Sequence, residues 1–407
     1  MAFARPLRAR PMAWLSLVMM ASLVASCSGT AAPGSPTGGT AVTSTSVTGS
    51  PTGAAPATSS SAVDCDSLSL RTGSGWYETN PTYRDPVDDS ADWVAASPTG
   101  QGVDVATLTA GVKAIQNSSL TSVLVVRSDE LVFERYLNGT DKATSSNIHS
   151  ASKTLLGAAL AVAVREGFLT SLDALVSDLL PEYFVNASAE KRGITIRHLM
   201  TMSSGLAWTD DETEYRIEKS SDWVKAVLDQ PLVATPGRTF NYSTGATHVL
   251  SAVLQRASGM STCQFVHQYL LTPMNVAAEH WGRDPQGISS GGYNVYLTPR
   301  DMAKFGLLLL NGGSWKGRQL VPSSFIAEAQ QPRFVVDSTY SYGELVWLRT
   351  IAGHQVFFAW GWGGQFIYVI PDYDVVLVAT ENTNDGHDNL EVDLGPFIQD
   401  YLLPALS

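Results

Sequence analysis

The chain has 407 residues, of which 44% are hydrophobic and 16% charged, a composition that excludes a disordered, fibrous or multi-span membrane protein. The formal net charge is −12, from 26 Lys and Arg against 38 Asp and Glu, and there is no basic run. Such a chain repels phosphate backbones, so no nucleic-acid partner is expected.

Residues 1–26 have the pattern of a bacterial secretory signal peptide. Basic residues at the start precede an apolar stretch, 12–24, that is too short to span about 30 Å of hydrocarbon as a permanent helix. Residues 24–27, Val-Ala-Ser-Cys, resemble a lipobox, so we expect lipid attachment at Cys27. The chain would then be a lipoprotein on the outer face of the cytoplasmic membrane. An ordinary signal peptide that ends near a cysteine is the alternative.

A linker over residues 27–62 follows the expected lipidation site. From Ser28 to Ala62 every residue except two valines is Ser, Thr, Gly, Ala or Pro. This composition cannot bury enough apolar surface to offset the entropy of ordering it, so a disordered tether is expected. Residues 63–407 have no second linker and no strong repeat, which predicts one domain.

Cys65 and Cys263 remain if Cys27 carries a lipid. In an oxidising setting they could form a disulfide bond between the start and the middle of the domain. Two unpaired buried thiols fit the sequence equally well. Neither cysteine has a Cys-x-x-Cys partner, and the seven histidines show no zinc-binding spacing, so no metal site is expected.

The domain has strand patterns near both ends and helical spacing between them. Two β-rich runs, 121–126 and 130–137, form a hairpin after a weakly amphipathic stretch at 105–116. Adjacent strands joined by short turns pair antiparallel. The sequence therefore predicts an α+β fold: an antiparallel sheet built from N- and C-terminal strands, flanked by helices, with an inserted α-rich lobe and the active site where the lobes meet. The other expected elements are helices at 152–164, 196–202, 221–228, 248–257, 299–310 and 390–403, and strands at 341–348, 355–359, 365–370 and 375–380.

A Ser-x-x-Lys pattern at Ser150 and Lys153 is the main catalytic candidate. Residues three apart lie on one face of a helix, so the Lys153 amine can reach the Ser150 hydroxyl. The pattern opens an apolar helix, where desolvation lowers the pKa of a lysine and the positive helix end favours an oxyanion. A helix cap with a surface lysine is the alternative. A second match, Ser188 to Lys191, lies in a polar run and is interpreted as surface.

Five blocks of sequence resemble, in the same order, those of the β-lactamase-related serine hydrolases. This superfamily includes class C β-lactamases, D-Ala-D-Ala carboxypeptidases, family VIII carboxylesterases and 6-aminohexanoate-dimer hydrolases. The resemblance covers roughly residues 105–403 and implies the β-lactamase/transpeptidase-like fold. The blocks are His149-Ser-Ala-Ser-Lys-Thr-Leu-Leu, Ile194-Thr-Ile-Arg-His-Leu-Met-Thr-Met-Ser-Ser-Gly-Leu, Phe240-Asn-Tyr-Ser-Thr-Gly-Ala, Leu297-Thr-Pro-Arg-Asp-Met-Ala-Lys-Phe-Gly and Gly361-Trp-Gly-Gly-Gln.

The resemblance implies a role for individual residues. Ser150 matches the family nucleophile, Lys153 its helical partner, and Tyr242 the general base, which the neighbouring ammonium would hold ionised or nearly so. The backbone N–H groups of Ser150 and Gln365 would bind the oxyanion. No metal ion or organic cofactor is implied.

Two departures from the family pattern lie in the substrate cleft. Thr244 stands where Tyr-x-Asn has its amide, and Trp362, Gly363 and Gly364 stand where the family usually has Lys-Thr-Gly. The second change removes the cation that commonly meets the carboxylate of penicillins and D-Ala peptides, and a buried carboxylate without a counter-charge is costly. Trp-Gly-Gly is similar to the family VIII esterases. The run 291–293 is a further candidate for the cleft border, and Asp301 with Lys304 is expected to be an exposed pair.

The sequence thus predicts a serine hydrolase that forms an acyl-enzyme on Ser150 and hydrolyses a carboxylic ester or amide. A peptidoglycan D,D-peptidase, penicillin-binding protein or β-lactamase is the nearest alternative, and a non-catalytic binding lipoprotein with this fold is another. The expected partners are a small ester or amide, or a cell-wall peptide, and a membrane reached through the lipid anchor. The oligomeric state is not predicted.

Overall fold

The computed structural model describes residues 63–67, 93, 98–210, 212–383 and 391–406. The predicted signal peptide, Cys27 and the linker over 27–62 lie outside the described residues. Within the described residues, no helix is both long enough and apolar enough to cross a lipid bilayer.

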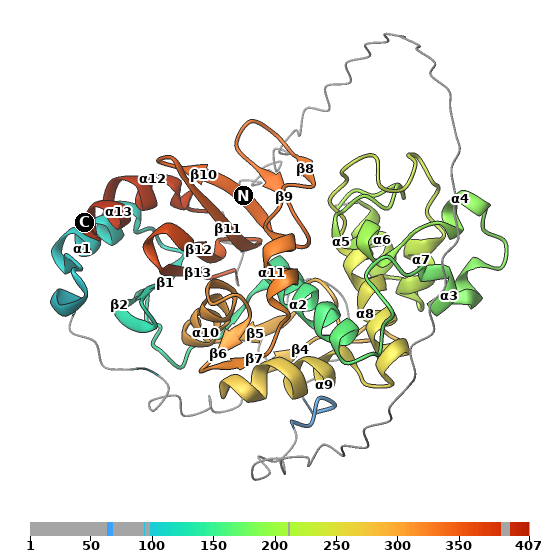
Figure 1. The fold of residues 1–407 in the computed structure, drawn as a ribbon, viewed down its shortest axis with the longest axis horizontal. Coiled ribbons are helices and arrows are strands. Elements are labelled where there is room, and N and C mark those ends of the chain that lie inside the picture. Colours follow the sequence, from blue (N-terminus) through green and yellow to red (C-terminus); the bar gives the residue numbers. More distant parts are fainter. Residues whose placement is uncertain (1–62, 68–92, 94–97, 211, 384–390, 407) are drawn as a thin grey trace, which may run out of the picture. The chain divides into compact units, whose positions relative to one another are not determined.

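An antiparallel sheet with the strand order β2-β1-β13-β12-β11-β10-β9-β8 lies on the left in Figure 1, and a group of helices lies on the right. The predicted hairpin pairs through β1 with β13, so strands from both ends of the domain form one sheet, as the sequence predicts. The strands are β1 (Leu120–Arg127), β2 (Glu130–Tyr136), β8 (Phe334–Val335), β9 (Ser341–Tyr342), β10 (Trp347–Ile351), β11 (His354–Gly361), β12 (Gln365–Ile370) and β13 (Val375–Glu381).

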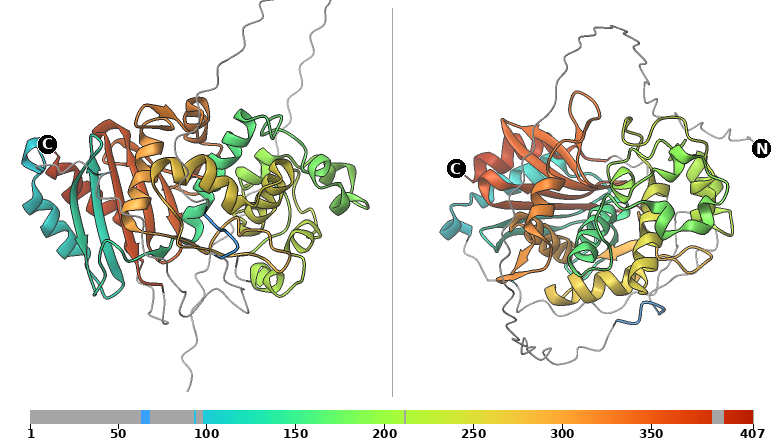
Figure 2. Two further views of the ribbon diagram at one scale, coloured as in Figure 1. Left: turned by 90° about the horizontal axis from the view of Figure 1, so that it is seen from below. Right: turned by 45° about the vertical axis from the view of Figure 1, so that its right-hand side comes forward.

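Both faces of this sheet are covered by helices (Figure 2). Every residue of β12 and β13 is buried, in keeping with the largely apolar sequences of these two strands. Alternate residues of the strands belong to two separate hydrophobic clusters. One cluster includes α1 (Val105–Ile115) and the C-terminal helices α12 (Leu394–Phe397) and α13 (Leu403–Ala405), and the other includes α2 (Ser152–Arg165) and α10 (Pro299–Leu310).

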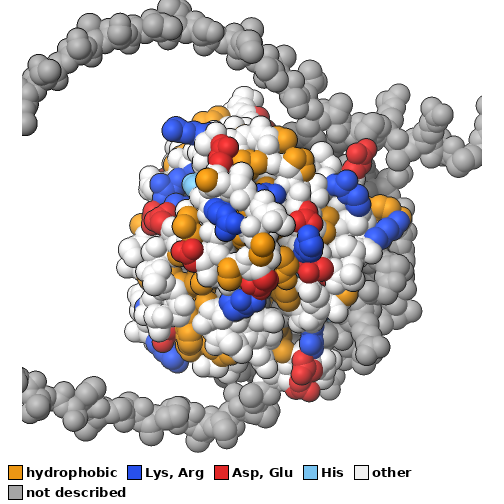
Figure 3. Space-filling view, turned by 90° about the vertical axis from the view of Figure 1, so that its right-hand side faces the viewer, with side chains coloured by type: hydrophobic (Ala, Val, Ile, Leu, Met, Phe, Trp, Pro, Cys, Tyr) orange, Lys and Arg blue, Asp and Glu red, His pale blue; other side chains and the backbone are white. Residues whose placement is uncertain are grey.

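The inserted segment between β2 and β8 supplies the helical lobe. Helix α2 is buried from Ser152 to Ala163 and packs against α8 (Thr244–Ser258). The remaining α-helices and strands of the described residues are α3 (Val176–Leu179), α4 (Ala189–Arg192), α5 (Ile196–Met200), α6 (Glu212–Glu218), α7 (Trp223–Leu228), α9 (Thr262–Val266), α11 (Ser323–Ala329), β3 (Ser146–Asn147), β4 (His280–Trp281), β5 (Val295–Leu297), β6 (Ser314–Trp315) and β7 (Arg318–Gln319). On the outer face of this lobe basic and acidic side chains are interspersed, so neither sign of charge dominates it (Figure 3).

The predicted strand over 341–348 is interrupted in the structure. It divides into β9 and β10, with a turn between them in which Leu345 has a positive φ of 58°. The predicted closing helix over 390–403 is also divided, because a π-helical segment, Ile398–Leu402, lies between α12 and α13. Helix α8 begins four residues before the predicted start at 248, where the Ser243 hydroxyl caps the N–H of Ala246.

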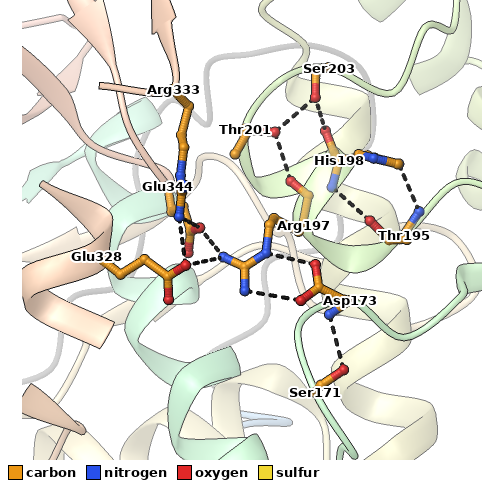
Figure 4. A network of polar contacts seen from close by, with 10 residues as sticks. All are labelled: Ser171, Asp173, Thr195, Arg197, His198, Thr201, Ser203, Glu328, Arg333 and Glu344. Carbon is orange, nitrogen blue, oxygen red and sulfur yellow. Dashed lines mark hydrogen bonds and ion pairs between the residues drawn. The ribbon is translucent and has the colours of Figure 1, made fainter. Parts of the chain in front are cut away.

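An ion-pair network joins this interrupted strand to the helical lobe (Figure 4). The carboxylate of Glu344, in the turn between β9 and β10, is fully buried and pairs with Arg197 of α5 and with Arg333. Arg197 also pairs with Asp173 at 2.7 Å and with Glu328 at 3.0 Å. A buried carboxylate is costly unless it is paired and hydrogen-bonded, so these arginines fix the turn at this point.

Cys65 and Cys263 form a disulfide bond, with their Cα atoms 6.0 Å apart. The bond joins the start of the described domain to α9, one of the two alternatives that the sequence left open. His267 lies beside it, but its Nε2 accepts a hydrogen bond from the N–H of Ala278 at 3.1 Å. Its Nδ1 therefore carries the proton and donates to the Cys263 carbonyl oxygen at 2.8 Å, so this cluster has the geometry of a disulfide packed on a histidine.

Reduction of this disulfide is expected to destabilise the domain by about 2–4 kcal/mol, because the bond closes a long loop in the unfolded chain. The two cysteines are 198 residues apart in sequence. Denaturant unfolding with and without a thiol reductant measures the effect. A Cys65→Ser/Cys263→Ser double variant should match the reduced protein and show no response to reductant. Equal stability of the oxidised and reduced proteins would contradict this expectation.

Candidate active site

Ser150 lies in the short helical turn η2 (His149–Ala151) that leads directly into α2. The chain reaches this turn from β3, and His149 has a positive φ of 45°. The end of β11 lies against the turn: a Cβ on Gly361 would come within 2.1 Å of the Ile148 carbonyl oxygen. Ser150 itself is half-buried, so its hydroxyl is placed at a helix N-terminus with access from outside.

Lys153 is one turn further along and is fully buried. Its Nζ donates to Ser150 Oγ at 2.7 Å, to Thr244 Oγ1 at 3.1 Å and to the Gly292 carbonyl oxygen at 3.0 Å. These three acceptors match the three N–H bonds of an ammonium group. Burial lowers the pKa of Lys153 to about 8, although the carboxylates of Asp210 and Glu214 act in the opposite direction.

Tyr242 lies two residues before α8 and completes the trio that the sequence predicts. The Lys153 Nζ is 5.2 Å from the centre of the Tyr242 ring, and the Ser150 hydroxyl is near enough to the phenol to act on its pKa. Burial, together with Asp210 and Glu214, raises the pKa of Tyr242 above its ordinary value, although the Ser150 hydroxyl acts in the opposite direction. The expectation that an ammonium holds this phenol ionised is therefore not met, and Lys153 is the group that titrates near neutrality.

His149 is adjacent to Ser150, but its environment keeps the imidazole neutral, as expected for a residue with a structural role. Burial first, and then the charge of Lys153, lower the pKa of His149 to about 3. Its Nε2 is 3.1 Å from Thr383 Oγ1, and its ring meets the Trp362 ring edge-on at 5.3 Å between centroids. A histidine that stays neutral at ordinary pH and packs in this way supports the turn.

The predicted oxyanion donor Gln365 is the first residue of β12, opposite Gly361 of β11. Its buried side chain donates to the Gly363 carbonyl oxygen at 3.1 Å and to the Glu381 carbonyl oxygen at 2.7 Å, which braces the turn between the strands. Strands β11 and β12 both contact turn η2, so the structure brings the backbone of Gln365 and Ser150 into one region. Trp362, at the tip of the same turn, is 39% exposed.

Gly364 allows this turn to lie close to β13. Its φ is +83°, and an added Cβ would lie 2.4 Å from the Glu381 side-chain carboxyl carbon. We expect Gly364→Ala to displace the Gln365 N–H and to lower kcat about 10²- to 10³-fold, the cost of losing one oxyanion donor.

Gly353→Ala is the matched control for this change, because Gly353 also has a positive φ, +88°, but open space around it. Ester hydrolysis and thermal unfolding, measured for both variants, separate the clash from backbone strain. Equal activity of the two variants would show that the position of this turn is unimportant.

Gly292, in the run predicted as a border of the cleft, supplies an acceptor to Lys153 through its backbone. Two other residues around the site, Asp210 and Glu214, carry no signal in the sequence. Asp210 accepts from the Trp208 indole N–H at 2.5 Å and from the Thr244 N–H at 3.4 Å. Asp210 and Glu214 follow no spacing that marks them as neighbours of Lys153, so only the fold reveals their influence on it.

Comparison with known proteins identifies the family to which this chain belongs. The Beta-lactamase family model matches residues 107–395, well over half of the chain. The chain belongs to the beta-lactamase family. It is 20% identical over 302 residues to an uncharacterized protein of Alkalihalophilus pseudofirmus, in a match that covers 64% of this chain and 83% of that protein.

Solved structures of this fold include enzymes named for different reactions. The D-stereospecific amidohydrolase from Streptomyces matches with a TM-score of 0.60 at 15% identity, over 74% of this chain and 99% of that chain. EstCE1, a hydrolase with promiscuous acyltransferase activity, matches with a TM-score of 0.58 at 18% identity, over 74% and 99%. At this level of identity the likeness shows the fold, and the predicted β-lactamase/transpeptidase-like architecture is confirmed.

Proposed function

We propose that this protein is a serine hydrolase that forms an acyl-enzyme on Ser150 and hydrolyses a carboxylic ester or amide. The observation that carries the proposal is a 2.7 Å hydrogen bond. It joins the buried Lys153 amine to the Ser150 hydroxyl, which lies just before the N-terminal end of α2. A lysine whose pKa is lowered to about 8 is partly neutral at ordinary pH and can accept the hydroxyl proton.

The proposed reaction has two stages. Lys153 takes the Ser150 proton, Oγ attacks the substrate carbonyl carbon, and the N–H groups of Ser150 and Gln365 bind the oxyanion. The C–O or C–N bond then breaks, and the leaving alcohol or amine takes a proton from Lys153, directly or through the Tyr242 phenol. Water attacks the acyl ester, loses a proton to Lys153, and the acid is released while Ser150 Oγ is reprotonated.

The residues around Ser150 favour an ester or simple amide over a penicillin. Trp362 occupies the position where the family pattern has a lysine, and the ionised groups that influence Lys153 are the carboxylates of Asp210 and Glu214. A substrate carboxylate placed there would lack a counter-charge. The names of two proteins with the same fold, an amidohydrolase and a hydrolase with acyltransferase activity, are in keeping with ester or amide chemistry.

The pH dependence of acylation tests the role of Lys153. Only the neutral amine can accept a proton, so the acylation rate should fall about tenfold per pH unit below the pKa and level off above about 8. The rate of the nitrophenol burst from a neutral ester, measured from pH 5 to 10, provides the profile. A rate that does not change through pH 8, or that falls there, is incompatible with this assignment.

A substrate screen tests the reaction class. Nitrophenyl esters of graded acyl length, linear amides, D-Ala peptides and a fluorescent penicillin are compared on the purified chain. Turnover of esters or amides that requires Ser150 supports the proposal. A long-lived penicillin adduct with little ester turnover would instead indicate a D,D-peptidase or penicillin-binding protein. Tight binding of one compound without any turnover would indicate a binding protein.

We also propose that the chain is exported and lipid-anchored at Cys27, which rests on the sequence of residues 1–62. Expression of the full chain in a bacterial host, with intact mass analysis of the membrane fraction, tests this. The expected product begins at a diacylated Cys27, and Cys27→Ala should abolish the lipid adduct. Recovery of an unmodified chain that begins elsewhere would reject the anchor without affecting the proposed chemistry.

A further inference from the structure

Asn147, the last residue of β3, connects turn η2 to the loop that precedes β5. Its Oδ1 accepts hydrogen bonds from the N–H of His149 at 3.0 Å and from the N–H of Asn294 at 3.1 Å. Its Nδ2 donates to Asn294 Oδ1 at 2.9 Å. Both asparagines are buried. One amide side chain thus makes two hydrogen bonds to the loop that precedes β5 and one to the first residue of turn η2.

Each end of this connection lies close to an atom of the site. His149 directly precedes Ser150, and Asn294 lies two residues after Gly292, whose carbonyl oxygen accepts from Lys153 Nζ at 3.0 Å. His149 and Asn294 have positive φ values of 45° and 56°. Residues other than glycine rarely adopt this conformation, and it persists only where the surroundings hold it.

We propose that Asn147 is a positioning residue that fixes the Ser150 hydroxyl relative to the Lys153 amine, by joining the nucleophile turn to the loop that carries the Gly292 carbonyl. This inference rests on the proposed function, because it concerns the same site. Loss of the Asn147 amide releases two buried N–H groups and frees the Gly292 carbonyl to move away from Lys153.

Losing the Asn147 amide should shift the pKa of Lys153 in one direction. The groups that face its amine are the oxygens of Ser150, Thr244 and Gly292, the Tyr242 ring, and, at longer range, Asp210, Glu214 and the neutral His149. A hydrogen-bond acceptor stabilises the charged form of an amine. Removing the Gly292 acceptor therefore lowers the pKa of Lys153 below that of the wild type.

The test compares wild type, Asn147→Ala and Asn294→Gly in two measurements. The first is the rate of fluorophosphonate labelling of the full chain against pH, normalised to folded protein. Misplacement of a catalytic group by about 1 Å can cost 10²-fold. We expect Asn147→Ala to slow labelling about 10- to 10²-fold and to move the midpoint to lower pH. Asn294→Gly keeps both backbone contacts of Asn147 and tolerates a positive φ, so it should shift both quantities less, and it remains informative if Asn147→Ala fails to fold.

The second measurement is an NMR titration of Lys153 in a Ser150→Ala background, which needs no activity. A lower Lys153 pKa in the Asn147 or Asn294 variant supports the positioning role. Unchanged Lys153 titration and unchanged labelling per folded molecule would overturn it. The control is Asn311→Ala, which removes an exposed asparagine bonded to Asp129 at 2.8 Å and should change neither quantity. If wild type is never labelled at Ser150, the proposed function fails, while the titration still decides the role of Asn147.

Discussion

Replacing Ser150 by alanine is expected to abolish fluorophosphonate labelling and to lower ester hydrolysis by about 10⁴-fold or more. This is the loss found when the nucleophile of a serine hydrolase is removed and the oxyanion donors remain. The substitution removes one hydroxyl from a half-buried position, so the fold should be retained. Labelling followed by gel fluorescence, with circular dichroism to confirm folding, measures the effect.

Ser188→Ala provides the matched control for this variant. Ser188 begins the second Ser-x-x-Lys match, but its hydroxyl caps α4 by accepting from the Lys191 N–H at 3.2 Å. Its loss should cost about 1 kcal/mol of stability, as for an ordinary N-cap, and leave labelling unchanged. Persistent labelling of Ser150→Ala, or its loss in Ser188→Ala, would show that the wrong serine has been assigned.

Replacing Lys153 by methionine is expected to lower the acylation rate about 10²- to 10⁴-fold, the range for removal of a general base. Methionine keeps most of the buried volume but cannot exchange a proton with Ser150, and it leaves Thr244 and the Gly292 carbonyl without their shared donor. The pH dependence with a midpoint near 8 should disappear together with the rate. Burst kinetics across pH measure both effects.

Lys191→Met serves as the control for the lysine variant. The Lys191 Nζ donates to the Gln230 carbonyl oxygen at 2.9 Å, outside the candidate site. Its removal should change neither the rate nor the pH midpoint. If Lys153→Met keeps the midpoint near 8, the titrating group is another residue and the proposed proton path is wrong.

Local patterns in the sequence were enough to locate most regular elements. Helix α10 and strand β12 have the predicted bounds, because a Pro after an N-cap threonine and a Gly-rich turn mark their starts. The break between β9 and β10 is not local, since it depends on Arg197 holding the buried Glu344. Asp301 and Lys304 were expected to be exposed, but both are buried: Asp301 accepts from the Thr298 hydroxyl at 2.8 Å, and Lys304 donates to the carbonyl oxygen of Asn275 at 2.9 Å.

The residues of the candidate site also differ in whether local sequence could predict them. Ser150 and Lys153 are three residues apart, so helix geometry alone predicts that they meet, and the structure brings them within 2.7 Å. Tyr242 and Gln365 come from distant parts of the chain, and only the family resemblance pointed to them. Asn147 follows neither a helical spacing nor a family motif, since its contacts depend on how two separate loops pack.

Mass spectrometry of a trapped acyl-enzyme tests the central claim most directly. The full chain is mixed with a slowly deacylating ester, quenched in acid and digested. The expected result is one acyl group per chain, on the peptide that contains Ser150, with more adduct above pH 8 than at pH 6. An adduct on any other residue, or steady turnover without an adduct under these conditions, would contradict the assignment of Ser150 as the nucleophile.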